Sequence, residues 1–265
     1  MKRLFSNIGW LLGGRGFNAV MSLVYLYLAT HTLGLESFGH FALIVALGQT
    51  VTGFASFQTW QFIVRWGANG DGSPEHPDPK AVREATGFAI ALDMLSVLIG
   101  TIGAALLILT AGLWLPLPED LYPLAFGYCV ISLLSIRTTP TGLLRLRFKF
   151  AMATAAEAVQ PAIRTLGALL AVFLMPNVTG CILAWAASEV AVALALWIAA
   201  GREESIAFTA LSLRTIPRRY TDAWAFVWST NMSGSLTTAG KQVTILLVGT
   251  FGGAALARGY RDASR

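Results

Sequence analysis

Ionisable and polar side chains interrupt the long apolar runs of this sequence, and they are its candidate functional residues. An ionisable group within a membrane is energetically costly and usually faces a cavity or a partner. Within several runs these residues recur three or four positions apart, which places them on one face of a helix. We therefore predict a polar cavity with the candidate binding residues Arg15, Asn18, Gln49, Asp93, Glu157, Arg164, Glu189, Asn231 and Lys241.

Structural interpretations of these residues remain open. Stripes of serine and threonine often mediate helix packing rather than solute binding. Glu157 lies within two turns of the inner end of its run, where it could reach the interface or pair with Arg145 or Lys149. A buried pair of Arg164 and Glu189 could merely hold two helices together.

Three cations lie at three different depths of the membrane in the predicted helices. At about 1.5 Å per residue, Arg15 lies in the inner half of its helix, Arg164 near the midplane and Lys241 in the outer half. Neither Arg15 nor Lys241 has an acidic residue nearby on its own helix. We predict that all three cations face one shared cavity.

The sequence shows no pattern of a catalytic or metal site. Cys129 and Cys181 are isolated in apolar runs, and His31, His40 and His76 are scattered. Neither a phosphate-binding glycine loop with its lysine nor a nucleophile paired with a base is found. We predict a protein that is not an enzyme and that needs no metal or cofactor.

The elements that position these residues are membrane helices. Hydrophobic residues make up 55% of the chain and charged residues 12%, against about 25% charged in a soluble domain. The apolar runs reach 20 residues or more, as a membrane helix requires, whereas a closed barrel would need alternating segments of about ten. The predicted spans are Ile8–Leu33, Phe38–Val64, Ala85–Trp114, Leu121–Thr141, Met152–Met175, Val178–Ala200 and Trp224–Phe251, with an eighth beginning near Ala254.

Lysine and arginine alternate between the loops in a way that predicts orientation. The loops His31–Phe38, Leu115–Asp120 and Pro176–Asn177 contain none. With the N-terminus in the cytoplasm, the loop cations up to Phe251 all lie on the cytoplasmic side. Cytoplasmic loops of membrane proteins carry such an excess of lysine and arginine. The membrane therefore explains the net charge of +5 better than nucleic acid does. These inner cations are Lys2, Arg3, Arg65, Lys80, Arg83, Arg137, Arg145, Arg147, Lys149, Arg202, Arg214, Arg218 and Arg219.

A weak repeat connects the two ends of the chain. In both Arg15–Phe41 and Met232–Tyr260, an apolar helix dotted with polar residues runs into a glycine-containing turn that an aromatic residue follows. In the first of them we predict a glycine-bounded turn over Gly34–Gly39. The period of roughly 220 residues is long enough for about six membrane helices.

The segments Thr32–Leu43, Trp60–Gly67 and Arg145–Arg164 resemble the polysaccharide transporter, or oligosaccharide flippase, family. This family belongs to the superfamily that includes multidrug and toxin extruders. The resemblance implies two six-helix bundles around a central cavity that works by alternating access. It predicts an all-α integral membrane fold with a first bundle at 1–200, a cytoplasmic linker at 201–223 and the start of a second bundle at 224–265. The sequence then holds only the first helix and a truncated second helix of that second bundle.

The resemblance implies translocation of undecaprenyl-diphosphate-linked oligosaccharide across the cytoplasmic membrane for surface polysaccharide synthesis. Cations in the cavity suit the pyrophosphate of such a substrate. A drug or toxin cation antiporter, which acidic residues such as Asp93 and Glu157 would suit, and a non-transporting scaffold or remnant are the alternatives. Expected partners are membrane lipid, the lipid-linked oligosaccharide and a polysaccharide polymerase or glycosyltransferases, but not nucleic acid. With the second bundle incomplete, we expect insertion without translocation by this chain alone, and lipid contact for Asn231, Thr238 and Lys241.

Overall fold

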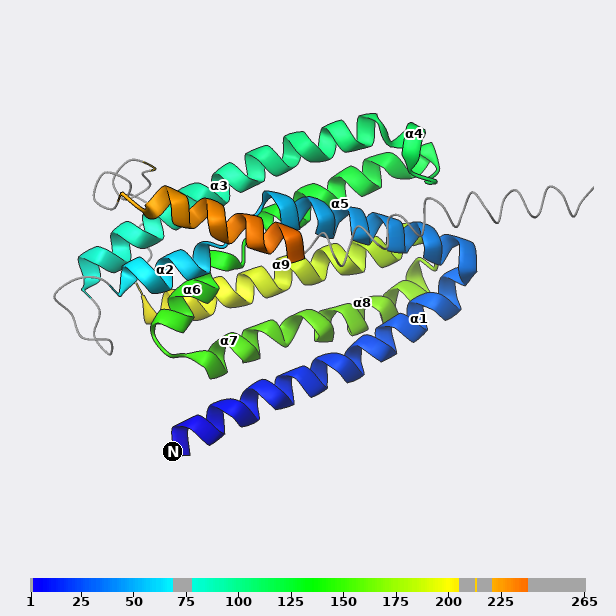
Figure 1. The fold of residues 1–265 in the computed structure, drawn as a ribbon. Coiled ribbons are helices and arrows are strands. Elements are labelled where there is room, and N and C mark those ends of the chain that lie inside the picture. Colours follow the sequence, from blue (N-terminus) through cyan, green and yellow to red (C-terminus); the bar gives the residue numbers. More distant parts are fainter. Residues whose placement is uncertain (1, 69–77, 205–212, 214–220, 238–265) are drawn as a thin grey trace, which may run out of the picture.

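The computed structural model describes residues 2–68, 78–204, 213 and 221–237, and for residues 2–12, 14, 15 and 35 the backbone alone. This part of the chain is a bundle of helices packed side by side, with no strand among the described residues (Figure 1). Its elements are α1 (Lys2–Ala55), α2 (Thr59–Gly67), α3 (Pro79–Leu109), α4 (Ala111–Trp114), the 3-10 helix η1 (Glu119–Leu121), α5 (Tyr122–Leu134), α6 (Thr138–Leu146), α7 (Phe150–Glu157), α8 (Val159–Leu174), α9 (Val178–Glu203) and a further helix at 223–237.

The helices are long and apolar enough to cross a membrane. Among the described residues, five segments meet this condition by length and composition. The protein is an all-α integral membrane protein, as the sequence predicts. The predicted first span lies in the part of α1 before Gly34, and half of the predicted seventh span lies outside the described residues. The five segments are Glu36–Gly67, Pro79–Leu109, Glu119–Leu146, Phe150–Leu174 and Val178–Glu203.

The first two predicted spans join more tightly than the sequence indicates. A glycine-bounded turn over residues 34–39 is the sequence prediction, but only Gly34 leaves the helical conformation, and the helix resumes directly after it. The φ of Gly34 is 72°, which a residue without a side chain adopts at little cost. The prediction of a six-residue turn is therefore wrong, because one residue at positive φ is sufficient to reverse the chain.

Three of the membrane segments are interrupted partway. The break at 158 separates α7 from α8, and Pro161 explains it, because proline has no N–H to donate to the carbonyl of Glu157. The breaks at 56–58 and 135–137 contain no proline or glycine. Groups from other helices bind the exposed backbone there, which keeps an irregular segment tolerable within a membrane. The Phe57 N–H donates to Ser96 Oγ (3.3 Å), and Trp197 Nε1 donates to the Ile136 carbonyl (3.0 Å).

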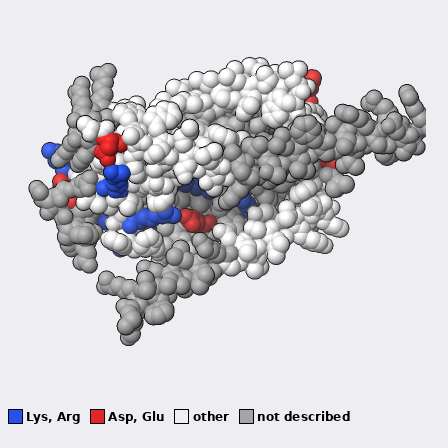
Figure 2. All heavy atoms as spheres, in the orientation of Figure 1, with Lys and Arg blue, Asp and Glu red and all other residues white. Residues whose placement is uncertain are grey.

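Charged residues concentrate at one end of the bundle. The bend of α1, α4 and the α8–α9 connection lie at one end, and α2, α6 and α7 lie at the other (Figure 1). Figure 2 shows blue and red atoms gathered toward the α2 end of this face, and mostly uncharged surface elsewhere. The described ion pairs at that end are Arg65–Asp222 (2.7 Å), Lys149–Glu203 (3.1 Å) and Arg147–Glu204.

The helix at 223–237 packs on α2 and α3 through aromatic side chains. Trp66 meets Phe226 edge to face, and Phe88 meets Trp224 in the same way. Asn231 is buried, with 8% of its surface exposed, so the prediction that it meets lipid is wrong. The reason is that α2 and α3 pack against this helix, with Ala223 and Val227 in one hydrophobic cluster with Phe62 and Phe88. Thr238 lies outside the described residues.

Candidate functional site

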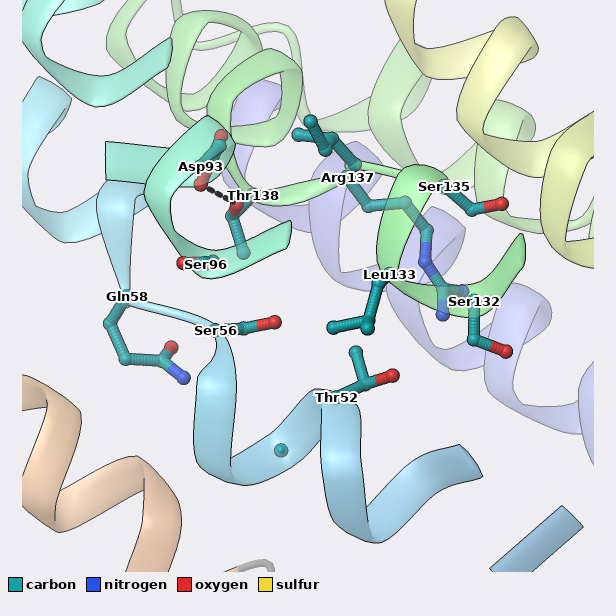
Figure 3. A pocket seen from close by; sticks show the side chains of 12 residues that line it. Thr52, Ser56, Gln58, Asp93, Ser96, Ser132, Leu133, Ser135, Arg137 and Thr138 are labelled. Carbon is teal, nitrogen blue, oxygen red and sulfur yellow. Dashed lines mark hydrogen bonds between the residues drawn. The ribbon is translucent and has the colours of Figure 1, made fainter. Parts of the chain in front are cut away.

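A polar cavity of about 190 Å³ lies between α1, α3, α5 and the two helix breaks at 56–58 and 135–137 (Figure 3). Hydroxyl groups dominate its lining, and an acid, an amide and an arginine accompany them. Such a surface can exchange many hydrogen bonds with a hydroxyl-rich solute. The lining residues are Thr52, Gly53, Ser56, Gln58, Asp93, Ser96, Ser132, Leu133, Ser135, Ile136, Arg137 and Thr138.

Asp93 is buried in the wall of this cavity and accepts hydrogen bonds from three threonines. Thr59 and Thr138 donate to Oδ1 at 3.1 and 3.0 Å, and Thr139 donates to Oδ2 at 2.5 Å. Thr59 is the first residue of α2 and Thr138 the first of α6, so two helix N-termini meet at one carboxylate. The positive end of each helix dipole favours a negative charge at this position. Asp93 therefore ties α2 and α6 to α3 directly after both breaks.

Glu189 on α9 is the centre of a second polar group. Its Oε1 accepts from Arg164 Nη2 (2.6 Å) and from Gln160 Nε2 (2.9 Å), both on α8. Arg137 Nη2 lies 2.7 Å from its Oε2, a charge contact without hydrogen-bond geometry. Arg164 Nε also donates to Ser188 Oγ at 3.0 Å. The group thus links α8, α9 and the break at 135–137.

Burial differs strongly within this group. Glu189 exposes 5% of its side chain and Arg164 13%, whereas Arg137 exposes 37%. The guanidinium of Arg164 also lies 5.2 Å from the ring centre of Trp185, within the range of a cation–π contact. Two guanidinium groups face one carboxylate, so the group carries one net positive charge. Arg137 is the more accessible cation, and it also lines the cavity.

Comparison with known proteins agrees with this architecture. Residues 4–260 match a family described as polysaccharide biosynthesis protein. The chain belongs to this family. It is also 28% identical over 261 residues to the inner membrane protein YghQ of Escherichia coli strain K12, covering 97% of this chain and 72% of that protein. No solved structure matches significantly.

The structure brings only some of the predicted site residues together. Arg164 and Glu189 are in direct contact, and Asp93 lies apart from them on the cavity wall. Gln49 is half-buried, with an interaction of its own. Asn18 is exposed on α1.

Of the remaining predicted residues, the structure describes Glu157 but not Lys241 or the side chain of Arg15. Glu157 is exposed on α7, and none of the ion pairs within the described residues includes it, so pairing with Arg145 or Lys149 is not found there. Lys241 and the side chain of Arg15 lie outside the described residues. A cavity shared by Arg15, Arg164 and Lys241 stays a prediction.

The sequence interpretation missed Arg137, the residue that both lines the cavity and contacts Glu189. It assigned Arg137 to the inner loops, but the residue lies inside the membrane segment Glu119–Leu146 and contacts buried Glu189. Its position four residues inside the predicted span Leu121–Thr141 was the available signal. The partners of Asp93 also escaped notice, because Thr59 and Thr139 are 34 and 46 residues away along the chain.

Proposed function

We propose that this protein takes part in translocating lipid-linked oligosaccharide across the cytoplasmic membrane, in surface polysaccharide synthesis and without enzymatic activity of its own. The observation that carries the proposal is the hydroxyl-lined cavity with Arg137 at its wall. A glycan is rich in hydroxyl groups, and its diphosphate link is anionic. The lining matches both, because arginine binds phosphate through several directed N–H groups.

Membership of the polysaccharide biosynthesis family supports the same substrate class. The proposal places the N-terminus and the segments Asn69–Lys80 and Arg202–Arg219 in the cytoplasm, in line with the lysine and arginine bias. It also places the lipid-linked oligosaccharide and a polysaccharide polymerase or glycosyltransferases among the partners. The inner membrane location of the relative YghQ agrees with a location in the cytoplasmic membrane.

The described site gives less support to export of organic cations. Asp93 is the acid that lines the cavity, and three threonine hydroxyls already occupy its oxygens. Glu189 faces two arginines. Neither carboxylate of the described site is available to a cationic solute without losing its present partners.

Deletion of the gene in its source organism tests the proposal. We expect loss of a surface polysaccharide and accumulation of its lipid-linked repeat unit, both reversed by the wild-type gene. Hypersensitivity to organic cations with unchanged polysaccharide would instead support cation export. An unchanged phenotype in both measurements would leave the scaffold interpretation.

A further inference from the structure

An apolar groove of about 250 Å³ runs between α5 and α9. Leu134, Val190 and Leu194 on its walls are exposed, which in a membrane helix indicates contact with hydrocarbon. A groove of this kind accommodates a flexible apolar chain. Its walls are Ile131, Leu134 and Ser135 on one side and Val190, Ala193, Leu194 and Trp197 on the other.

The groove adjoins the polar cavity across the break at 135–137. Ser135 lines both, and in Figure 3 its hydroxyl points away from the centre of the cavity. Arg137, two residues further on, lines the cavity and contacts Glu189, the residue before Val190. Arg137, which is partly exposed, therefore lies where the groove and the cavity approach each other.

We propose that this groove holds the isoprenoid chain of a lipid-linked oligosaccharide, next to the diphosphate, while the glycan occupies the polar cavity. The inference rests on the proposed function and names the part of the site that binds the lipid. An occupant of both spaces needs one apolar chain joined at its end to an anionic, hydroxyl-rich group. A two-chain phospholipid with a small headgroup fits the groove but leaves the cavity unused.

The charges around Arg137 allow it to engage a phosphate. A guanidinium has five N–H donors, and one of its nitrogens is directed at Glu189. Glu189 keeps its contacts with Arg164 and Gln160 if Arg137 turns toward an anion. Phosphate binding at Arg137 therefore leaves no buried charge without a partner.

Site-specific photo-crosslinking tests where the chain binds. Benzoylphenylalanine is placed at Leu194 in the groove, or at Leu183 as a control on the same helix. The two positions are similarly exposed, at 56% and 51%. With radiolabelled undecaprenyl diphosphate in liposomes of phosphatidylethanolamine, we expect strong labelling at Leu194 and weak labelling at Leu183. Equal labelling at both positions, or equal competition by excess phosphatidylglycerol, overturns the proposal.

Substitution of Arg137 tests the phosphate contact. Loss of a hydrogen bond to a charged group predicts that Arg137→Gln weakens undecaprenyl diphosphate binding about tenfold. Arg137→Lys should retain most of the affinity, and the neutral alcohol undecaprenol should bind all three forms equally. An unchanged affinity of Arg137→Gln for the diphosphate contradicts the assignment.

The experiments distinguish a failure of the translocation function from a failure of the lipid groove. Labelling at Leu194 without any polysaccharide phenotype on gene deletion refutes the translocation function and keeps the lipid groove. A polysaccharide phenotype without selective labelling at Leu194 refutes the groove and keeps the function.

Discussion

Replacing Glu189 with glutamine should destabilise the fold more than replacing either arginine that it contacts. Removing one partner of a buried ion pair costs about 3–5 kcal/mol, because the other charge stays buried without compensation. Glu189 and Arg164 expose 5% and 13% of their side chains, so most of that cost applies to Glu189→Gln. Arg164→Gln should cost about 2–3 kcal/mol, since Glu189 keeps Arg137 and Gln160. Arg137 is more than a third exposed, and solvent screening limits Arg137→Gln to about 0–1 kcal/mol.

Urea unfolding in detergent micelles, followed by circular dichroism, measures these differences at one detergent concentration. Lys149→Gln is the matched control, because it breaks a more exposed pair, Lys149–Glu203, and should cost less than about 1 kcal/mol. The double substitution of Arg164 and Glu189 should be less harmful than the sum of the single ones. A cost for Arg137→Gln equal to that for Glu189→Gln, or additive effects in the double variant, would refute this account of the charge network.

Three further outcomes follow from the fold. Asp93→Leu removes the acceptor of three threonine hydroxyls and should lower the free energy of unfolding by at least about 2 kcal/mol. Thr110→Ala, at the exposed residue directly after α3, should change it by less than about 0.5 kcal/mol. Similar effects in urea unfolding would contradict the role of Asp93. Gly100→Ala would place a Cβ 2.5 Å from Leu133 Cδ2 and should lower the free energy of unfolding by about 1–3 kcal/mol. Gly103→Ala has nothing within 4 Å of its Cβ and should be neutral or slightly stabilising. A greater loss of stability for Gly103→Ala than for Gly100→Ala would refute the close packing of α3 on α5. Single cysteines at 72 and 210 should react with impermeant maleimide only from the cytoplasmic side, and a cysteine in place of exposed Glu119 only from outside. Outside labelling at either of the first two would overturn the orientation.

Hydropathy was sufficient to predict the helices but not their interruptions. An apolar run of 20 or more residues has few alternatives to a membrane helix, because every backbone polar group must find a partner within the segment. The break between α7 and α8 could be read from the sequence, because the effect of Pro161 is local. The breaks at 56–58 and 135–137 depend on Ser96 and Trp197, which lie on other helices and far along the chain.

The candidate site was predictable in part, from residues spaced along one helix and from the opposite charges of Arg164 and Glu189 on neighbouring helices. Gln160 and Arg164 lie four residues apart, and both reach Glu189. Arg137 is the opposite case, since a cation near a span end is normally a loop residue and only the fold turns it toward Glu189. The burial of Asn231 was equally hidden, because it depends on which surface covers the helix at 223–237.

The leaflet distribution of the lipid-linked repeat unit tests the central claim most directly. Spheroplasts of the source organism, with and without the gene, are treated with an impermeant reagent that oxidises exposed glycans, and the modified fraction of the lipid-linked pool is measured. We predict that the repeat unit is modified when the gene is present and stays protected, on the cytoplasmic leaflet, when it is absent. An equal modified fraction in both strains would contradict translocation by this protein.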